Sequence, residues 1–360
     1  MPLWSEPSLV SPADLAACRA LLRDGSRSFQ AAARLLPRRV RDDAVALYAF
    51  CRVADDVIDQ DAGSDGDGYA RDEAALAGLY ERLALAYAGT PAPTPADRAL
   101  ADLVARRRIP IALPAALLEG FAWDSAGRRY EDLSGLIAYA VRVAGSVGAM
   151  MALLMGARAP RVVARACELG VAMQLTNIAR DVGQDARAGR LYLPLSWLRQ
   201  AGIDPDAWLA DPVFNDALGA VVRRLLCEAD ALYRRAEAGI GRLPLSCRPG
   251  ISAARLLYAE IGHAVERRGY DSVSGRAVVP AGRKMQLLAR GIYVATMATR
   301  PGPAQPLPEA AFLVEAVADA MRRSLARQPA PAVRSGSRLA WVIDLFARLE
   351  RRDQLERAAP

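Results

Sequence analysis

The stretch DDAVALYAFCRVADDVID, at residues 42–59, carries two stripes of side chains at helical spacing. The apolar stripe suits packing against a core and consists of Leu47, Cys51, Ala54 and Ile58. The polar stripe consists of Tyr48, Arg52, Asp55 and Asp59. Such a helix buries one face and presents a phenol, a guanidinium and two carboxylates to whatever lies beside it. Because like charges one turn apart destabilise a helix, Asp55 and Asp59 indicate a cation between them.

A second polar stripe lies in GVAMQLTNIARDVGQD, at residues 170–185. Its members are three or four positions apart and are Gln174, Asn177, Asp181 and Asp185, with Arg180 adjacent. Two helices that each offer a carboxylate pair can form a cleft for metal ions and for an anionic group such as a diphosphate. Oxygen ligands without histidine or cysteine select a hard cation. The two stretches together therefore predict a Mg²⁺ site, with Mn²⁺ as the alternative ion.

The composition of the 360-residue chain narrows the chemistry further. A single histidine, His263, excludes a His-rich metal site, and five cysteines without a CxxC pair argue against a thiolate zinc site. We interpret His263 as a packed or surface residue. The odd cysteine count fits a reducing cytoplasm. The net charge of +7, with Lys284 as the only lysine, is compatible with anionic ligands or an anionic membrane surface.

Proline and glycine divide the chain into helical segments, and almost no stretch alternates β-branched and polar residues as a strand would. We therefore predict an all-α fold. The expected helices lie at 12–36, 38–59, 69–89, 95–107, 114–127, 133–155, 161–184, 215–238, 247–268 and 282–299. The longest uncharged run, 143–157, is shorter than the roughly 20 residues of a membrane span, so we expect a buried helix there.

The composition changes at RPGPAQPLPE, residues 300–309. We predict one domain over about 10–300 and an appended, arginine-rich helical tail over 301–360, and we expect the domain to fold without the tail. Apolar residues repeat at helical spacing within 338–357. This segment is expected to pack on the domain, with a membrane-surface or partner-binding helix as the alternative.

Five parts of the sequence resemble the squalene and phytoene synthase family, and its bacterial phytoene synthases in particular. They are GSRSFQAAARLLP (25–37), YAFCRVADDVID (48–59), YAVRVAGSVG (139–148), LTNIARDVGQDARAGRLYLP (175–194) and the region 258–283. The resemblance covers about 10–300 in consistent order. The spacing of Asn177, Asp181 and Asp185 distinguishes this family from terpene cyclases and chain-elongating prenyltransferases, whose second motifs are spaced differently.

The resemblance implies a single isoprenoid-synthase-type helical domain around a central cavity. It also implies a prenyltransferase of carotenoid biosynthesis that condenses two geranylgeranyl diphosphates head to head, through prephytoene diphosphate, to phytoene. The implied catalytic metal ligands are Asp55, Asp59, Asp181 and Asp185. Tyr48 and Tyr139 are implied to line the reacting centre. The implied substrate-binding residues are Ser26, Ser28, Phe29, Arg52, Gln174, Asn177, Arg180, Tyr258 and Arg283.

Two alternatives to phytoene synthesis stay open at the level of the sequence. One is a squalene or dehydrosqualene synthase acting on farnesyl diphosphate. Squalene formation needs NADPH, whereas we expect no NADPH requirement here. The other is a non-catalytic family member that acts as an assembly protein, and the presence of all four aspartates argues against it. One departure from many relatives is Gln184 in place of Glu, which lowers the negative charge near the metals.

The expected partner is geranylgeranyl diphosphate, and we expect no nucleic acid. The expected location is the cytoplasm. Peripheral association with the inner face of the cytoplasmic membrane and contact with other enzymes of the carotenoid pathway are further expectations.

Overall fold

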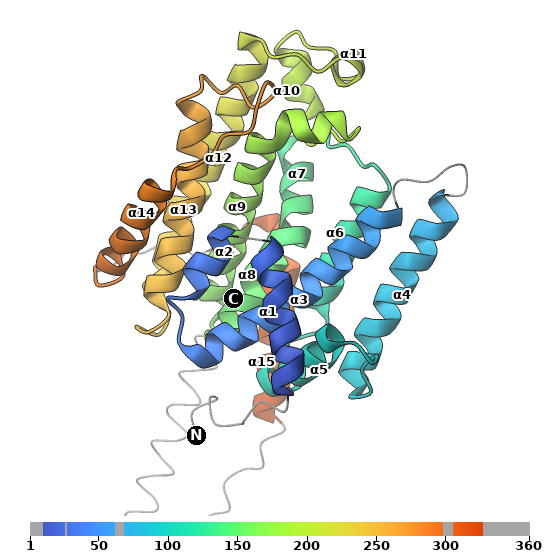
Figure 1. The fold of residues 1–360 in the computed structure, drawn as a ribbon, viewed down its shortest axis with the longest axis vertical. Helices are drawn as coiled ribbons and strands as arrows, with labels where there is room; N and C mark the ends of the chain where they lie inside the picture. The colour runs from blue at the N-terminus through green and yellow to red at the C-terminus, as the bar shows by residue number, and fades with distance from the viewer. Residues whose placement is uncertain (1–9, 26, 62–67, 298–304, 327–360) are drawn as a thin grey trace, which may run out of the picture.

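The computed structural model describes residues 10–25, 27–61, 68–297 and 305–326, and no β-strand occurs in these ranges (Figure 1). The all-α prediction is therefore confirmed. The longer helices are α1 (Pro12–Gly25), α3 (Arg38–Asp61), α4 (Gly68–Ala88), α5 (Pro95–Arg107), α6 (Ala112–Ser125), α9 (Pro160–Arg187), α12 (Asp216–Ile240), α13 (Arg248–Glu266), α14 (Ala281–Val294) and α15 (Ala311–Ala326). The shorter ones are α2 (Arg27–Ala33), α7 (Leu133–Ala140), η1 (Val141–Gly145), α8 (Ser146–Leu154), α10 (Leu195–Gln200), α11 (Pro205–Ala210) and η2 (Pro308–Ala310).

Helix α9 occupies the middle of the fold and packs against α8, α12 and α13 (Figure 1). Its neighbour is formed by α7, η1 and α8, which run on without a break from Leu133 to Leu154. By length and composition this is the one helix in the described ranges that could cross a membrane, and 67% of its most apolar window is buried. The expectation of a buried helix over 143–157 is confirmed. The central segment, η1, is a π-helix, which the sequence pattern did not indicate.

Glycines bring the backbones of α8 and α9 into direct contact. A Cβ atom on Gly148 would lie 2.1 Å from the carbonyl oxygen of Ala166. A Cβ atom on Gly170 would lie 2.2 Å from the carbonyl oxygen of Ala144. No larger residue fits at either position unless the helices separate, so these two glycines fix the distance between α8 and η1 on one side and α9 on the other.

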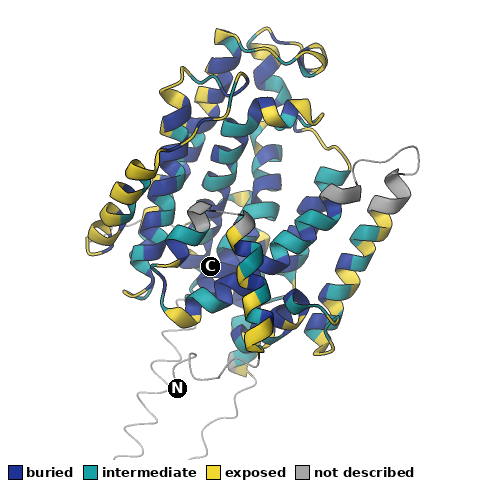
Figure 2. Ribbon diagram, in the orientation of Figure 1, coloured by how far each residue is buried: buried dark blue, intermediate teal, exposed yellow. Residues whose placement is uncertain are grey.

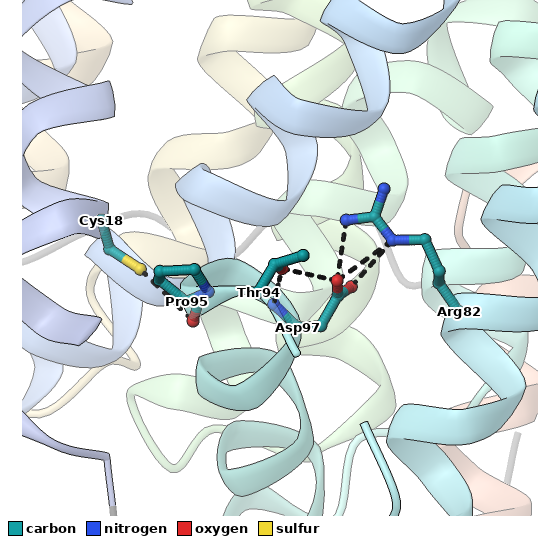
Figure 3. A network of polar contacts seen from close by, with 5 residues as sticks. All are labelled: Cys18, Arg82, Thr94, Pro95 and Asp97. Carbon is teal, nitrogen blue, oxygen red and sulfur yellow. Dashed lines mark hydrogen bonds and ion pairs between the residues drawn. The ribbon is translucent and has the colours of Figure 1, made fainter. Parts of the chain in front are cut away.

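A buried polar network fixes the start of α5, as Figure 3 shows. Pro95 occupies the first turn, and the backbone N–H of Asp97 donates to the hydroxyl of Thr94 at 3.2 Å. The Asp97 carboxylate is fully buried and accepts from Arg82 of α4 at 2.8 and 3.0 Å. The thiol of Cys18 in α1 lies 3.9 Å from the carbonyl oxygen of Pro95. This network joins α1, α4 and α5 around one helix end.

Helix α15 belongs to the same core as the rest of the fold, which differs from the predicted appended tail. Leu313 and Val317 are buried completely or almost completely, and α15 packs against α9, α6 and α8. The carbonyl oxygen of Gln305 accepts from Arg165 at 2.8 Å, and Glu309 accepts from Ser134 at 2.6 Å. The proline-rich composition therefore does not mark the end of the domain, because the helix after it belongs to the core. The segment 338–357 lies outside the described residues.

Candidate active site

A cavity of about 340 Å³ runs along one face of α9. The α9 residues that line the cavity run from Val162 to Asn177 and are alternately three positions and one position apart. This spacing places them on a single face of the helix. That face is roughly 22 Å long at the rise of an α-helix. The other walls come from α3, η1, α8, α12 and α13. The lining is mainly apolar and includes Leu47, Val147, Met151, Leu169, Met173 and Ile240.

Apart from Arg165 near the start of α9, the polar lining collects where α9 approaches its aspartates. Gln174 and Asn177 lie on the last cavity-lining turns of α9, and Tyr48 and Tyr258 face the cavity from α3 and α13. Burial raises the pKa of the Tyr48 phenol, while the charge of Arg52 opposes this rise and Asp55 adds to it. Four residues predicted from the sequence therefore come together at one place, although they belong to three helices.

The aspartates of α3 and α9 extend the same faces beyond the cavity. Asp55 follows Cys51 by one turn, and its carboxylate lies 3.3 Å from the guanidinium of Arg52. Arg52 also forms a hydrogen bond of 3.1 Å with Asp56. Asp59 is in α3, but its side chain lies outside the described residues. Among the described side chains, the first motif therefore places the carboxylate of Asp55 and the guanidinium of Arg52 near the end of the cavity.

On α9, Asp181 is held between two arginines. Its carboxylate accepts from Arg180 at 2.8 and 2.5 Å and from Arg276 at 2.8 and 3.2 Å. One turn later, burial raises the pKa of Asp185 to about 7, and the charges of Asp181 and Asp124 add to this rise. Arg190 and Arg180 act in the opposite direction. The second motif therefore combines one carboxylate paired with two arginines and one whose pKa is raised mainly by burial.

Asp124, from α6, adds a carboxylate that the sequence analysis did not identify. It accepts hydrogen bonds from the hydroxyls of Tyr139 and Tyr192, each at 2.8 Å. Burial raises its pKa to about 6; the two tyrosine hydrogen bonds lower it, while Asp55 raises it. The Tyr139 ring stacks on the ring of Tyr192 at 5.3 Å between centroids. Tyr139 is thus buried beside the carboxylates, and it is not among the residues that line the cavity.

This set of donors fits a hard divalent cation. The charge of Asp55 raises the pKa of Asp124, and the charges of Asp181 and Asp124 raise the pKa of Asp185, so the four carboxylates lie within electrostatic range of one another. A cation among them removes the repulsion, and carboxylate oxygens are the ligands that Mg²⁺ prefers. Within the described residues, no three acidic, histidine or cysteine side chains already surround one point.

Arg276 reaches Asp181 because the loop after α13 is fastened to α9. The backbone N–H of Gly183 donates to the carbonyl oxygen of Ser272 at 3.0 Å, and a Cβ atom on Gly183 would lie 2.5 Å from the carbonyl oxygen of Val273. Asp271 shapes the loop by accepting from the backbone N–H of Val273 at 3.0 Å. Glycine at 183 therefore lets the loop lie directly on the helix and places Arg276 over the second motif.

Replacing Gly183 by Ala should lower kcat/KM at least about tenfold. The added Cβ displaces Val273 and with it Arg276, and misplacement by about 1 Å at a reacting site costs up to roughly a hundredfold. Steady-state kinetics with geranylgeranyl diphosphate, the substrate expected from the sequence, measures the effect. Gly78→Ala is the matched control, because a Cβ there meets nothing within 4 Å. Wild-type kcat/KM in Gly183→Ala would show that the loop tolerates the displacement.

The remaining predicted residues lie elsewhere or outside the described part. Arg283 is on α14, donates to Glu260 at 2.9 Å and lines a separate hollow on the outside of α13. His263 lies in the same hollow, 3.7 Å from Glu260, which agrees with its interpretation as a surface residue. Ser26 lies outside the described residues, as do the side chains of Ser28 and Phe29, whose backbone forms part of α2.

Residues 22–283 match the sequence model of one family, described as squalene/phytoene synthase. The chain belongs to this family. It is 52% identical over 322 residues to a phytoene synthase of Cereibacter sphaeroides, covering 87% of this chain and 90% of that one. It is 42% identical to a 15-cis-phytoene synthase of a Paracoccus species, over 78% of this chain and 91% of that one. The family predicted from the motifs is confirmed.

Solved structures of the squalene/phytoene synthase family share this fold. A dehydrosqualene synthase crystallised with a ligand superposes with a TM-score of 0.69 at 31% identity, covering 78% of this chain and 95% of that chain. A squalene synthase from Alicyclobacillus acidocaldarius superposes with a TM-score of 0.64 at 27% identity, covering 72% and 95% of the two chains. The predicted isoprenoid-synthase-type fold is confirmed by these likenesses.

Proposed function

We propose that the protein is a phytoene synthase, which condenses two geranylgeranyl diphosphates head to head to phytoene. The observation that carries this proposal is the junction of a long apolar cavity with a group of carboxylates and arginines. The cavity accommodates isoprenoid chains, and the charged end receives diphosphates. The similarity of the chain to the phytoene synthases of Cereibacter sphaeroides and a Paracoccus species favours phytoene over squalene as the product.

The first step is loss of diphosphate from an allylic carbon, and the charged end supports it. Arg52, Arg180 and Arg276 can donate to the diphosphate oxygens as negative charge develops on them. Asp55, Asp59, Asp181 and Asp185 would hold Mg²⁺, or Mn²⁺ in its place, and the ion supplies neutralising charge to the leaving group. In the described structure the arginines are paired with Asp55 and Asp181, so metal binding by these carboxylates would free the guanidiniums for substrate.

The allylic cation that remains must be protected from water until the second chain attacks it. The cavity walls do so because they are aliphatic along most of their length, with Met151 and Met173 among them. Tyr139 and Tyr192 fix the orientation of the Asp124 carboxylate through their hydroxyl hydrogen bonds. Attack by the double bond of the second chain, followed by loss of a proton to the released diphosphate, closes the cyclopropane ring of prephytoene diphosphate, whose own diphosphate then leaves.

The final step removes a proton to form the central double bond of phytoene. No histidine or lysine lines the cavity among the described residues, so a side chain of either kind is not the base. The released diphosphate, retained by Arg52 and Arg180, is close to the cation and takes the proton. Quenching by proton loss requires no hydride, which is why NADPH is not needed. A cytoplasmic location and contact with other enzymes of the carotenoid pathway stay predictions.

Product analysis tests the proposed function. With geranylgeranyl diphosphate and Mg²⁺, and without NADPH, the protein should release inorganic diphosphate and a colourless forty-carbon hydrocarbon, phytoene. Because a dehydrosqualene synthase and a squalene synthase share the fold, farnesyl diphosphate should be tested as the comparison substrate. Squalene formed only when NADPH is supplied, or a far higher kcat/KM for farnesyl diphosphate, would contradict phytoene synthesis and leave the family membership intact.

A further inference from the structure

Helix α14 is attached to the fold by one narrow face. Leu287 is buried against Leu256 and Leu257 of α13, and a Cβ atom on Gly291 would lie 2.7 Å from the Cα atom of Ala253. The backbones of α13 and α14 are therefore in close contact along one side. The opposite side of α14 lies at the edge of the molecule, where Figure 2 shows the helix mainly as exposed.

The outward side of α14 is apolar. Among the described residues, six of the eleven exposed large hydrophobic side chains fall between Val278 and Met297. On α14 itself, the exposed fraction is 66% for Met285, 49% for Ile292 and 65% for Tyr293. Their spacing of seven and eight positions puts them on one helix face, together with the exposed Ala289. We call Met285, Ala289, Ile292 and Tyr293 the outer face of α14.

Positive charge flanks the outer face, and negative charge is absent from this part of the sequence. No aspartate or glutamate occurs between Asp271 and Glu309, whereas α14 carries Arg283, Lys284 and Arg290. Arg283 pairs with Glu260, while Lys284 and Arg290 form no ion pair with any described residue. A hollow of about 250 Å³ beside the helix has a basic lining, with Arg234, Arg255, Arg283 and Arg290 against Asp230 and Glu260.

A second copy of the chain does not complement this surface. Two outer faces packed together would bring Lys284 and Arg290 of one copy against the same cations of the other, which costs electrostatic free energy. The surface of an anionic bilayer supplies the missing negative charge and also an apolar layer for the side chains. With 14 residues, α14 is too short to span a bilayer and has the composition of a helix that lies in its plane.

We propose that α14 binds anionic phospholipid bilayers. In this arrangement Met285, Ile292 and Tyr293 enter the boundary between headgroups and acyl chains, while Lys284 and Arg290 lie at the lipid phosphates. The inference rests on the surface alone and holds whichever hydrocarbon the enzyme releases. It gives the expected peripheral association a location on the fold, on the far side of α13 from the cavity.

Co-sedimentation of the full chain with vesicles tests this surface. Wild-type protein should bind vesicles containing phosphatidylglycerol more strongly than vesicles of phosphatidylcholine alone, and salt at about 0.5 M should weaken this preference. The double variant Ile292→Ser/Tyr293→Ser should lower the partition coefficient at least about tenfold. Lys284→Gln and Arg290→Gln should each lower it about fivefold on the anionic vesicles only.

The matched control removes two exposed hydrophobic side chains elsewhere. Val213→Ser/Leu245→Ser alters residues that are 54% and 73% exposed, and it should leave vesicle binding unchanged. Turnover of detergent-dispersed substrate should be unchanged in all these variants, so loss of vesicle binding is distinguished from loss of folding or of catalysis.

Three results would overturn the proposal. Wild-type protein that ignores anionic vesicles would remove its basis. Equal binding by the wild type and the Ile292→Ser/Tyr293→Ser variant would place the membrane contact elsewhere, for instance in residues 327–360. A wild-type dimer that the same variant converts to monomers, with vesicle binding unaffected, would assign the outer face to a second copy of the chain.

Discussion

Replacing Asp185 by Ala should reduce turnover at least about a thousandfold while the helical circular-dichroism signal stays unchanged. Asp185 is partly buried near Asp181 and Asp124, and in the proposed mechanism its charge helps to hold the metal that neutralises the departing diphosphate. Removal of a single preorganised group that stabilises developing charge costs roughly a hundred- to a thousandfold, and loss of an ion costs more. Release of diphosphate and formation of prephytoene diphosphate and phytoene are the quantities to measure.

The variants Asp55→Ala, Asp59→Ala and Asp181→Ala should behave like Asp185→Ala. Asp211→Ala is the matched control, because Asp211 is exposed at the end of α11, away from the cavity, and its loss should leave turnover unchanged. Full activity in any two of the four site variants would refute the metal assignment. Loss of the helical signal in all four would instead assign the carboxylates a structural role.

Ending the chain after Thr299 should abolish cooperative folding. Leu313, Val314 and Val317 of α15 are buried against the core, and each is worth about 1.5–3 kcal/mol. Their combined loss, about 5–9 kcal/mol, is comparable with the 5–15 kcal/mol that stabilises a typical folded protein. Thermal unfolding and size-exclusion chromatography measure the effect, and aggregation is the expected outcome.

A chain ended after Ala326 is the control for this truncation. It keeps α15 and removes only residues 327–360, so it should unfold cooperatively and keep its metal-dependent activity. If the shorter chain ending at Thr299 remains monomeric and unfolds cooperatively, α15 contributes little to stability in spite of its burial. Residues 10–300 would then fold as a domain of their own, as the sequence predicted.

The parts of the site that lie on long helices could be predicted from the sequence. Tyr48 and Asp55 on α3, and Asn177 and Asp181 on α9, are fixed relative to one another by the helical period alone. Two such stripes with complementary chemistry then specify that α3 and α9 face the same space. The structure places Tyr48 and Asn177 in the lining of one cavity, as the stripes imply.

Other parts of the site depend on contacts between distant segments, which no local pattern records. Arg276 comes just after the loop that packs on Gly183 of α9. Arg276 can pair with Asp181 because of this packing contact. Asp124 has no second carboxylate at helical spacing in α6, so its approach to Tyr192 was not signalled. Arg283 was expected to bind substrate but lines a separate hollow. Its distance from Tyr258 along the chain does not tell which side of α13 the next helix, α14, covers.

Two helices differ from their expected ranges. One helix was expected over 12–36, whereas α1 ends at Gly25 and α2 begins at Arg27. The apolar pattern is broken by RDGSRS, residues 23–28, and Gly25 within this stretch marks the helix end that the expected range passed over. Likewise, the expected helix at 133–155 contains the π-helical segment η1, whose extra residue per turn leaves the apolar composition unchanged.

The contact between α8 and α9 through Gly148 and Gly170 constrains how the enzyme can diversify. Both glycines line the cavity, and each leaves no room for even a methyl group without separating the helices. These two positions are therefore closed to gradual adjustment by mutation, whether in nature or in the laboratory. New substrate lengths are accessible through lining positions that carry side chains, such as Leu47 on α3 and Ile240 on α12, which can change size without moving a backbone.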